Sequence, residues 1–331
     1  MLKPNLLLRG FNIQHRKLSK LSGNHPANYT PVMKPLAKAY IALAFVCFVW
    51  GTTYLALRVG VSHFPAFLFS AVRQTIAGIL LVGIAVIWGK ERLSFEKGAM
   101  RYVVPGILMI SLGNGLVGWA QQYIPSGLAA LICSIMPVWV VIINLSASKD
   151  DRPNWQIALG LALGCAGMAV VFRENVADLA NWDYLFGIVL TFIATLSWAL
   201  GSIYAKQKPG NSGLLANAGL QLFFGGIGLF AFSWAFDDYD RWHGLVDEGV
   251  WALAYLVIFG SIGAFAAFSY ALSKLPVGLV SIYAYINPLV AVFLGWLILS
   301  EKFNPAVLVA LLLTIGGVFV VNRGYRAMRY P

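Results

Sequence analysis

The stretch FVWGTTYLALR, from Phe48 to Arg58, returns later in the chain in altered form as LSWALGSIYAK, from Leu196 to Lys206. In both stretches a Trp lies among apolar, small and hydroxyl residues, and a cation follows that Trp by eight positions. A shift of 148 residues places the first stretch on the second. The similarity indicates an internal duplication.

The composition is that of an integral membrane protein. Of the 331 residues, 59% are hydrophobic and 11% are charged, whereas a soluble domain carries about 25% charged residues. The mean hydropathy is +0.74. Ten apolar stretches reach the roughly 20 residues needed to cross a bilayer, so we predict an all-α membrane fold with ten transmembrane helices. These stretches are residues 39–57, 66–89, 102–120, 127–147, 154–173, 184–206, 214–236, 249–271, 277–299 and 304–322.

The two ends of the chain differ from its apolar middle. Residues 1–37 carry basic side chains, no acidic one and no apolar core of signal-peptide length, so we expect a disordered arm and no cleaved signal. Met33 directly precedes the first span and is an alternative start of translation. Residues 324–331 are expected to form a cytoplasmic tail.

The distribution of charges predicts the orientation in the membrane. With the N-terminus in the cytoplasm, 19 of the 24 Lys and Arg residues lie on the cytoplasmic side, four lie outside, and Arg73 lies within a span. Nine of the 13 acidic residues lie outside, five of them in the loop 237–248. Because cytoplasmic loops are enriched in Lys and Arg, we expect both termini to be cytoplasmic. Orientation explains the net charge of +11, and we expect no nucleic-acid partner.

The duplication extends over the whole apolar part of the chain. The shift of 148 residues also places Arg73 on Gln221, and a shift of 151 residues aligns the later spans. The further aligned pairs are Gly78 with Gly226, Pro125 with Pro276, Gly127 with Gly278, Pro137 with Pro288 and Asp150 with Glu301. We therefore predict two five-helix repeats, 38–173 and 184–323. Since five is odd, the second repeat crosses the membrane in the opposite sense, as in transporters with inverted repeats.

These stretches resemble the EamA-like branch of the drug/metabolite transporter superfamily over roughly residues 38–323. The most specific part is KLPVGLVSIYAYINPLVAVFLGWLILSEKF, with Pro-x-Gly, a second Pro and a Glu at the helix end, followed by Gly-Gly in LTIGGVFVV. The first repeat departs from this pattern, with SKDDRP where the second has SEKFNP. Asp150 is therefore not assigned the role of Glu301.

The resemblance implies a transporter of small metabolites, amino acids among them. It implies that the first four helices of each repeat enclose the pathway, and that the fifth and tenth lie at the periphery as the surface of a homodimer. Gly160 and Gly164, four residues apart in the fifth span, permit close helix packing or dimer contact. We expect a multi-pass protein of the inner (plasma) membrane.

Two prolines occupy matching places in the repeats, Pro137 in the fourth span and Pro288 in the ninth. Each lacks an amide hydrogen and clashes with the carbonyl group four residues earlier, so each is expected to kink its helix. Matching interruptions point to a site near the midplane and to gating. The alternative is that the prolines only bend the helices for packing.

Arg73 is the cation that lies deep in a span. An unpaired guanidinium at mid-bilayer costs at least about 2.5–3.5 kcal/mol, so this side chain should face the interior or a watery vestibule. It could bind a carboxylate or phosphate of the solute, or it could bond backbone carbonyls as a structural clamp.

The other polar residues inside the spans are neutral and are accompanied by aromatic residues. This mixture suits a zwitterionic or amphipathic solute with an apolar or aromatic body, although aromatic residues at helical spacing also serve packing alone. The predicted substrate-binding residues are Trp50, Tyr54, Arg73, Asn114, Gln122, Trp198, Ser202, Gln221, Tyr270, Tyr283 and Asn287, and the predicted gating residues are Pro137 and Pro288.

Motifs of other functions are missing from the sequence. There is no glycine-rich phosphate-binding loop with Lys-Ser or Lys-Thr, so we expect no ATP hydrolysis by the chain itself. Cys47, Cys133 and Cys165 lack metal-ligand spacing, and we expect neither a metal nor a cofactor. No acidic residue lies deep in a span, so a carboxylate proton relay has no candidate unless Glu301 protonates at the outer edge.

We therefore predict a secondary transporter, not an enzyme, that exports amino acids or related compounds by alternating access between the repeats. One alternative is an integral-membrane enzyme, which would need a cluster of His, Asp and Glu at one membrane face. Another is a small-ion channel, for which kinked inverted halves would have no purpose.

Overall fold

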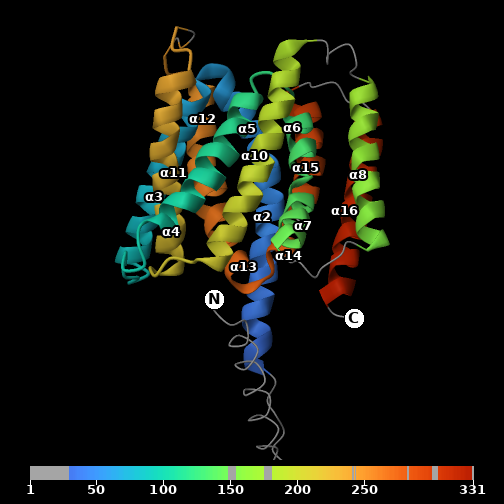
Figure 1. The fold of residues 1–331 in the computed structure, drawn as a ribbon. Helices are drawn as coiled ribbons and strands as arrows, with labels where there is room; N and C mark the ends of the chain where they lie inside the picture. The colour runs from blue at the N-terminus through green and yellow to red at the C-terminus, as the bar shows by residue number, and fades with distance from the viewer. Residues whose placement is uncertain are drawn as a thin grey trace, which may run out of the picture. The chain divides into compact units, whose positions relative to one another are not determined.

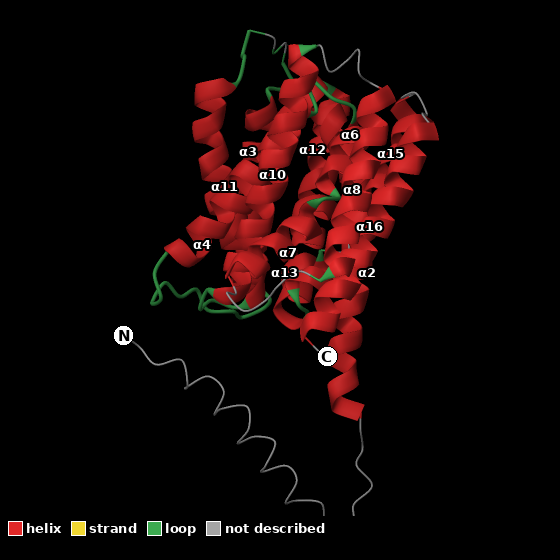
Figure 2. Cartoon of the chain, turned by 45° about the vertical axis from the view of Figure 1, so that its right-hand side comes forward, coloured by secondary structure: helices red, strands yellow, loops and turns green. Residues whose placement is uncertain are grey.

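The computed structural model describes residues 30–329 except 148–153, 175–180, 241, 243, 282 and 300–304. These residues form helices joined by turns and loops, and no strand occurs among them (Figure 2). By its contacts the chain divides into two units, Met1–Lys38 and Ala39–Pro331. The first unit is described only from residue 30, so most of the predicted arm lies outside the described residues. The second unit contains the helical bundle.

The two predicted repeats contain the same series of elements (Figure 1). The first comprises α2 (Thr30–His63), α3 (Ala66–Ile87), α4 (Met100–Pro105), η2 (Gly106–Asn114), α5 (Gly115–Ala120), α6 (Ser126–Cys133), α7 (Met136–Ala147) and α8 (Trp155–Glu174). The second comprises α10 (Trp182–Gln207), α11 (Leu214–Phe236), α12 (Asp247–Tyr255), η3 (Leu256–Gly263), α13 (Ala264–Lys274), α14 (Val277–Val280), α15 (Tyr283–Leu299) and α16 (Pro305–Arg329). The residues expected to form the C-terminal tail continue α16 as far as Arg329.

Eight helical stretches of the described chain are long and apolar enough to cross a membrane. They coincide with eight of the ten expected spans. The other two expected spans, 154–173 and 304–322, correspond to α8 and α16, whose apolar parts Trp155–Gly164 and Leu308–Val321 are shorter. The fold is an all-helical membrane fold, and the number ten stays a prediction.

The third helix of each repeat contains a π-helical segment, which the sequence analysis did not predict. The segments are η2 between α4 and α5, and η3 between α12 and α13. A π-helix widens the hydrogen-bonded turn, and such segments are often found at functional sites. Their matching positions follow the duplication.

Helices α3 and α11 pack closely along each other, and glycines make this possible. A Cβ atom on Gly78 would lie 2.5 Å from the backbone nitrogen of Phe223, and one on Gly226 would lie 2.3 Å from Thr75 Oγ1. Gly78 and Gly226 are one of the pairs aligned by the duplication. The repeats therefore contact each other through equivalent glycines.

A carboxylate of each repeat caps the first turn of a helix in the other repeat, so that both α3 and α11 are capped. Asp237, which follows α11, accepts hydrogen bonds from the backbone N–H groups of Phe67 (3.1 Å) and Leu68 (2.7 Å) in the first turn of α3. Glu91, which follows α3, accepts from Leu215 (3.4 Å) and Ala216 (2.9 Å) in the first turn of α11. The α3–α11 pair is thus tied by carboxylates at both of its ends.

Helix α8 lies beside α16 at one edge of the bundle (Figures 1 and 2). A Cβ atom on Gly160 would lie 2.3 Å from the carbonyl oxygen of Gly317, and one on Gly317 would lie 2.8 Å from the backbone nitrogen of Gly164. Gly160 and Gly317 therefore allow α8 and α16 to approach closely, whereas a Cβ atom on Gly164 would meet no atom within 4 Å, and a dimer contact through this face stays a prediction.

Candidate functional site

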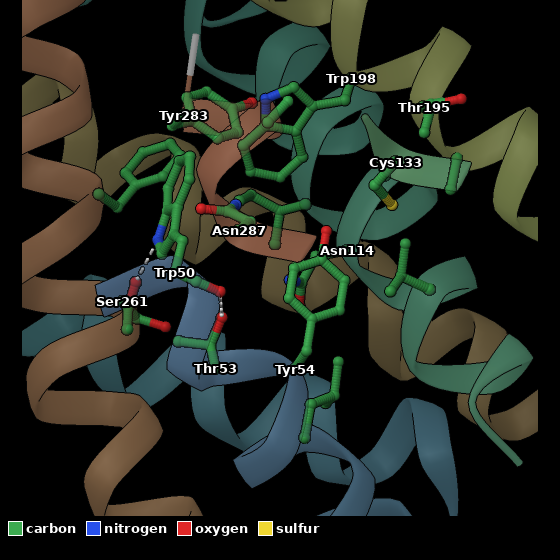
Figure 3. Close-up of a pocket in the computed structure, with 18 of the residues that line it drawn as sticks. Trp50, Thr53, Tyr54, Asn114, Cys133, Thr195, Trp198, Ser261, Tyr283 and Asn287 are labelled. Carbon is green, nitrogen blue, oxygen red and sulfur yellow. Dashed lines mark hydrogen bonds between the residues drawn. The ribbon is translucent and has the colours of Figure 1, made fainter. Parts of the chain in front are cut away.

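A cavity of about 90 Å³ lies between the two repeats and is lined by residues of both (Figure 3). Helices α2 and α3 and the segment from η2 to α7 form its wall on the side of the first repeat, and α10, α11, η3, α13 and α15 form its wall on the side of the second. Seven of the eleven predicted substrate-binding residues line it. They are Trp50, Tyr54, Arg73, Asn114, Trp198, Tyr283 and Asn287.

The other four predicted residues do not line this cavity. Gln122 lines a second pocket, at the end of the bundle where α2 meets α3. The hydroxyl of Ser202 lies 3.5 Å from the sulfur of Met109. Gln221 is buried in α11, and Tyr270 is partly buried in α13. The structure therefore separates these side chains from the central group.

Arg73 is at the centre of a network of polar side chains. It is 3% exposed, and its Nε donates a hydrogen bond to Ser261 Oγ at 2.9 Å. Ser261 Oγ in turn donates to Gln74 Oε1 at 3.0 Å, and Gln74 Nε2 donates to Asn114 Oδ1 at 3.1 Å. The network therefore joins α3 of the first repeat to both π-helical segments.

One nitrogen of this guanidinium, Nη1, is buried and has no hydrogen-bond partner among the described residues. A guanidinium carries five N–H donors, and leaving a buried donor unpaired costs about 1–3 kcal/mol. Because Arg73 lines the cavity, an oxygen of a bound solute could occupy the missing position.

The π-helical segments also give room to the side chains of the opposite repeat. A Cβ atom on Gly113 in η2 would lie 2.8 Å from Cε3 of Trp198, and one on Gly260 in η3 would lie 3.0 Å from Nη2 of Arg73. Gly260 further accepts a hydrogen bond on its carbonyl oxygen from Trp50 Nε1, at 3.0 Å. The widened turns thus place backbone against the residues of the site.

Four aromatic rings pack together at the cavity, and three of them, those of Trp50, Trp198 and Tyr283, line it. Trp50 makes edge-to-face contacts with Trp198 and Tyr283, with ring centroids 5.4 and 4.8 Å apart, and its ring lies 5.1 Å from that of Phe268. Such pairs contribute about 0.5–1.5 kcal/mol each beyond the area they bury. Toward the Arg58 end, Leu57 and Val117 complete the wall.

The fourth helix of each repeat is broken beside the cavity. The first break follows Cys133 and the second follows Val280, and in each a serine hydroxyl donates to the carbonyl three residues earlier. Ser134 Oγ bonds Leu131 O at 2.6 Å, and Ser281 Oγ bonds Gly278 O at 3.0 Å. Both predicted gating prolines are buried, Pro137 in the first turn of α7 directly after the first break and Pro288 inside α15, further along from the second.

Several cavity residues were missed by the sequence analysis. They include Thr53, Gln74, Thr195 and Ser261. Gln74 directly follows Arg73, and its position in an apolar span was an available signal. Nothing in the sequence linked Ser261, 188 residues away, to Arg73.

The whole apolar part of the chain matches a known family twice. The model of the EamA-like transporter family matches residues 37–173 and again residues 185–323. The two matches correspond closely to the two predicted repeats.

Similar proteins occur in several bacteria. YedA of Escherichia coli (strain K12), named an uncharacterized inner membrane transporter, is 30% identical over 88% of this chain and 92% of its own length. YoaV of Bacillus subtilis (strain 168), named an uncharacterized transporter, is 25% identical over 86% of this chain and 97% of its own. Protein PecM of Dickeya dadantii (strain 3937) is 28% identical over 83% of this chain and 89% of its own.

A solved crystal structure has the same fold, with a TM-score of 0.65 at 19% identity over 89% of this chain and 99% of that one. The apolar helices and the family match agree on a multi-pass membrane transporter. The chain belongs to the EamA-like transporter family.

Proposed function

We propose that the protein is a secondary transporter of the inner membrane that exports amino acids or related small metabolites. The observation that carries the proposal is the central cavity, in which Arg73 of one repeat and Ser261 of the other are hydrogen-bonded to each other while Arg73 Nη1 has no partner among the described residues. A carboxylate is the group that best completes such a site, because a guanidinium binds it with charge-assisted hydrogen bonds.

The rest of the cavity fits the other end of such a solute. Trp50, Tyr54, Trp198 and Tyr283 supply an aromatic surface, and their rings can accept an apolar body or a cationic amino group. The amide of Asn287, oriented so that its nitrogen donates, bonds the carbonyls of Cys47 at 3.0 Å and Tyr283 at 2.9 Å, which leaves its oxygen as an acceptor. These contacts favour a zwitterion.

Movement of the solute requires that the cavity open alternately at its two ends. At about 90 Å³ it is smaller than the roughly 300–1,000 Å³ of ordinary ligand pockets, so binding must enlarge it. The broken fourth helices with Pro137 and Pro288 offer places where each repeat can bend. In the inverted-repeat mechanism, bending of one repeat opens the cavity to one side of the membrane. The equivalent bending of the other repeat opens it to the opposite side.

An integral-membrane enzyme is the competing function. Among the described residues there is no group of three or more His, Cys, Asp and Glu side chains that could hold a metal ion. Relatives carry the name transporter, which favours transport for this chain as well.

The test is a counterflow assay with the purified protein in liposomes loaded with unlabelled solute. Labelled amino acids, nucleosides, sugars and organic acids are offered outside in turn. We expect accumulation of at least one amino acid when the same compound is inside, and none in protein-free liposomes. Failure of every amino acid to exchange, with exchange of another class, would overturn the substrate class. Chemical conversion of a solute without exchange would favour the enzyme.

A further inference from the structure

A second pocket lies at the Arg58 end of the bundle, beyond the wall that Leu57 and Val117 form around the central cavity. Its volume is about 410 Å³, against about 90 Å³ for the central cavity. The larger volume lies within the range of about 300–1,000 Å³ that is typical of ligand pockets. In this conformation the second pocket, and not the central cavity, has room for a small metabolite.

Gln121 gives this pocket the character of a binding site. It directly follows α5 and lies four residues, one helical turn, beyond Val117, so it stands between the two cavities. Its side chain is fully buried, yet neither Oε1 nor Nε2 has a hydrogen-bond partner among the described residues. A buried amide without partners is unfavourable, and an apolar residue would pack at lower cost. The unpaired amide therefore indicates a ligand that supplies both a donor and an acceptor.

Charges of both signs line the same pocket. Arg58 provides a guanidinium, and Asp237 and Asp238 provide carboxylates. The Asp237 carboxylate accepts from the backbone of α3, and the Asp238 side chain is exposed. Aromatic residues, among them Trp119, Tyr123 and Trp242, line the remaining wall together with polar ones such as Gln122. A small zwitterion with an apolar or aromatic body complements all of these groups.

We propose that this pocket, hereafter the vestibule site, binds a zwitterionic amino acid on its way between the central cavity and the surface. The carboxylate lies toward Arg58, the ammonium group toward Asp238, and Gln121 bonds the solute on the side of the central cavity. The site deepens the proposed function and rests on it for the solute class. Its occupancy can nevertheless be measured without transport.

The test uses L-phenylalanine as the probe and the purified protein in nanodiscs. Ser62, an exposed residue of the vestibule wall, is changed to Cys, and its alkylation by a maleimide is timed at rising phenylalanine concentrations. The chain without this cysteine gives the blank, which measures any alkylation of Cys47, Cys133 and Cys165. We expect phenylalanine to slow the alkylation of Ser62→Cys, and phenylalaninamide and phenylacetate, which each lack one charge, to do so far less.

Two added substitutions separate the vestibule from the central cavity. Gln121→Leu should raise the half-protecting concentration about tenfold, without lowering the melting temperature, because it removes an unpaired amide. Arg73→Gln, which changes the central cavity, should leave the protection in place. Protection that survives Gln121→Leu but disappears with Arg73→Gln would overturn the vestibule site and leave the proposed function standing. An absence of protection in all variants would overturn the vestibule site, whereas protection without counterflow would overturn only the proposed function.

Discussion

At the scale of single residues, the cations that end the duplicated stretches have equivalent contacts at opposite ends of the molecule. Arg58 Nη1 donates to the carbonyl of Ile124 at 3.3 Å, and Lys206 Nζ donates to the carbonyls of Leu272 at 2.6 Å and Ser273 at 3.2 Å. Ile124 follows α5, and Leu272 and Ser273 lie in the last turn of α13. Each cation therefore joins the first helix of its repeat to the end of the third, where helix carbonyls attract positive charge.

This contact predicts a loss of stability when Lys206 is replaced. Lys206→Met keeps the length and the apolar stem but leaves the carbonyls at the end of α13 without a cation, so the protein should lose about 1 kcal/mol of stability. Lys208→Met is the matched control, since the Lys208 ammonium lies over the ring of Tyr204, 5.5 Å from its centroid, and bonds no helix-end carbonyl in the part of the chain that the structure describes. The measurement is thermal unfolding in detergent. Equal melting temperatures for the two variants would contradict the role given to Lys206.

Arg73 carries the second prediction at this scale. Arg73→Gln should raise the apparent KM about tenfold for solutes with a carboxylate, because a charge-assisted contact is lost in the central cavity. The amidated forms of the same solutes should be affected much less. Gln is a suitable replacement because the duplication places Gln221 at the equivalent position.

Counterflow with each pair of solutes, acid and amide, measures the difference. A folded Arg73→Gln protein that loses transport of both members equally would make Arg73 a structural clamp, held by Ser261.

At the scale of elements, the reciprocal caps of α3 and α11 hold the two repeats together. Asp237→Ala removes the acceptors of two N–H groups in α3, and Glu91→Ala removes those of two in α11. Each change should lower stability by about 1–2 kcal/mol, as expected for loss of an N-terminal cap and of a favourable charge at a helix start. The exposed Asp240 and Glu96 provide controls, whose replacement by Ala should change stability by less than about 0.5 kcal/mol. The measurement is thermal unfolding of the four variants. Equal melting temperatures for all four would show that Asp237 and Glu91 do not act as caps.

The broken fourth helices lead to a prediction about rate. Pro288→Ala restores an N–H group inside α15 and should straighten that helix, and Pro137→Ala restores one in the first turn of α7, which should allow α6 and α7 to join as one helix. We expect each to slow counterflow several-fold per molecule of folded protein. Pro305→Ala, at the exposed first position of α16, is the control and should transport normally. If the amount of folded protein and the activity fall in the same proportion, the prolines serve packing alone.

At the scale of the whole molecule, the sequence was informative wherever hydropathy and duplication determine structure. The length of the apolar stretches predicted the spans. The repeat identified Trp50 and Trp198 as candidate site residues, and their rings are in contact at the cavity. The π-helical segments η2 and η3 were not predicted, because the change from α-helical to π-helical hydrogen bonding does not alter the pattern of apolar residues. Ser261 and the caps Asp237 and Glu91 were missed because their partners lie in the other repeat, and a single sequence carries no information on such distant contacts.

The orientation of the whole molecule in the membrane is the last prediction, and it follows from charge alone. Of the 24 Lys and Arg residues, 19 fall on the side assigned to the cytoplasm, whereas the loop 237–248 holds five acidic residues. A cation near a span resists translocation, so this loop should lie outside and the loop between α3 and α4 inside. Alkaline phosphatase, which is active only outside the cytoplasm, should be active when fused after Asp247 and inactive when fused after Lys97. A green fluorescent protein fused at the same two positions should give the opposite result. Phosphatase activity after Lys97 together with fluorescence after Asp247 would show that the orientation is the reverse of the predicted one, and the vestibule site would then face the cytoplasm.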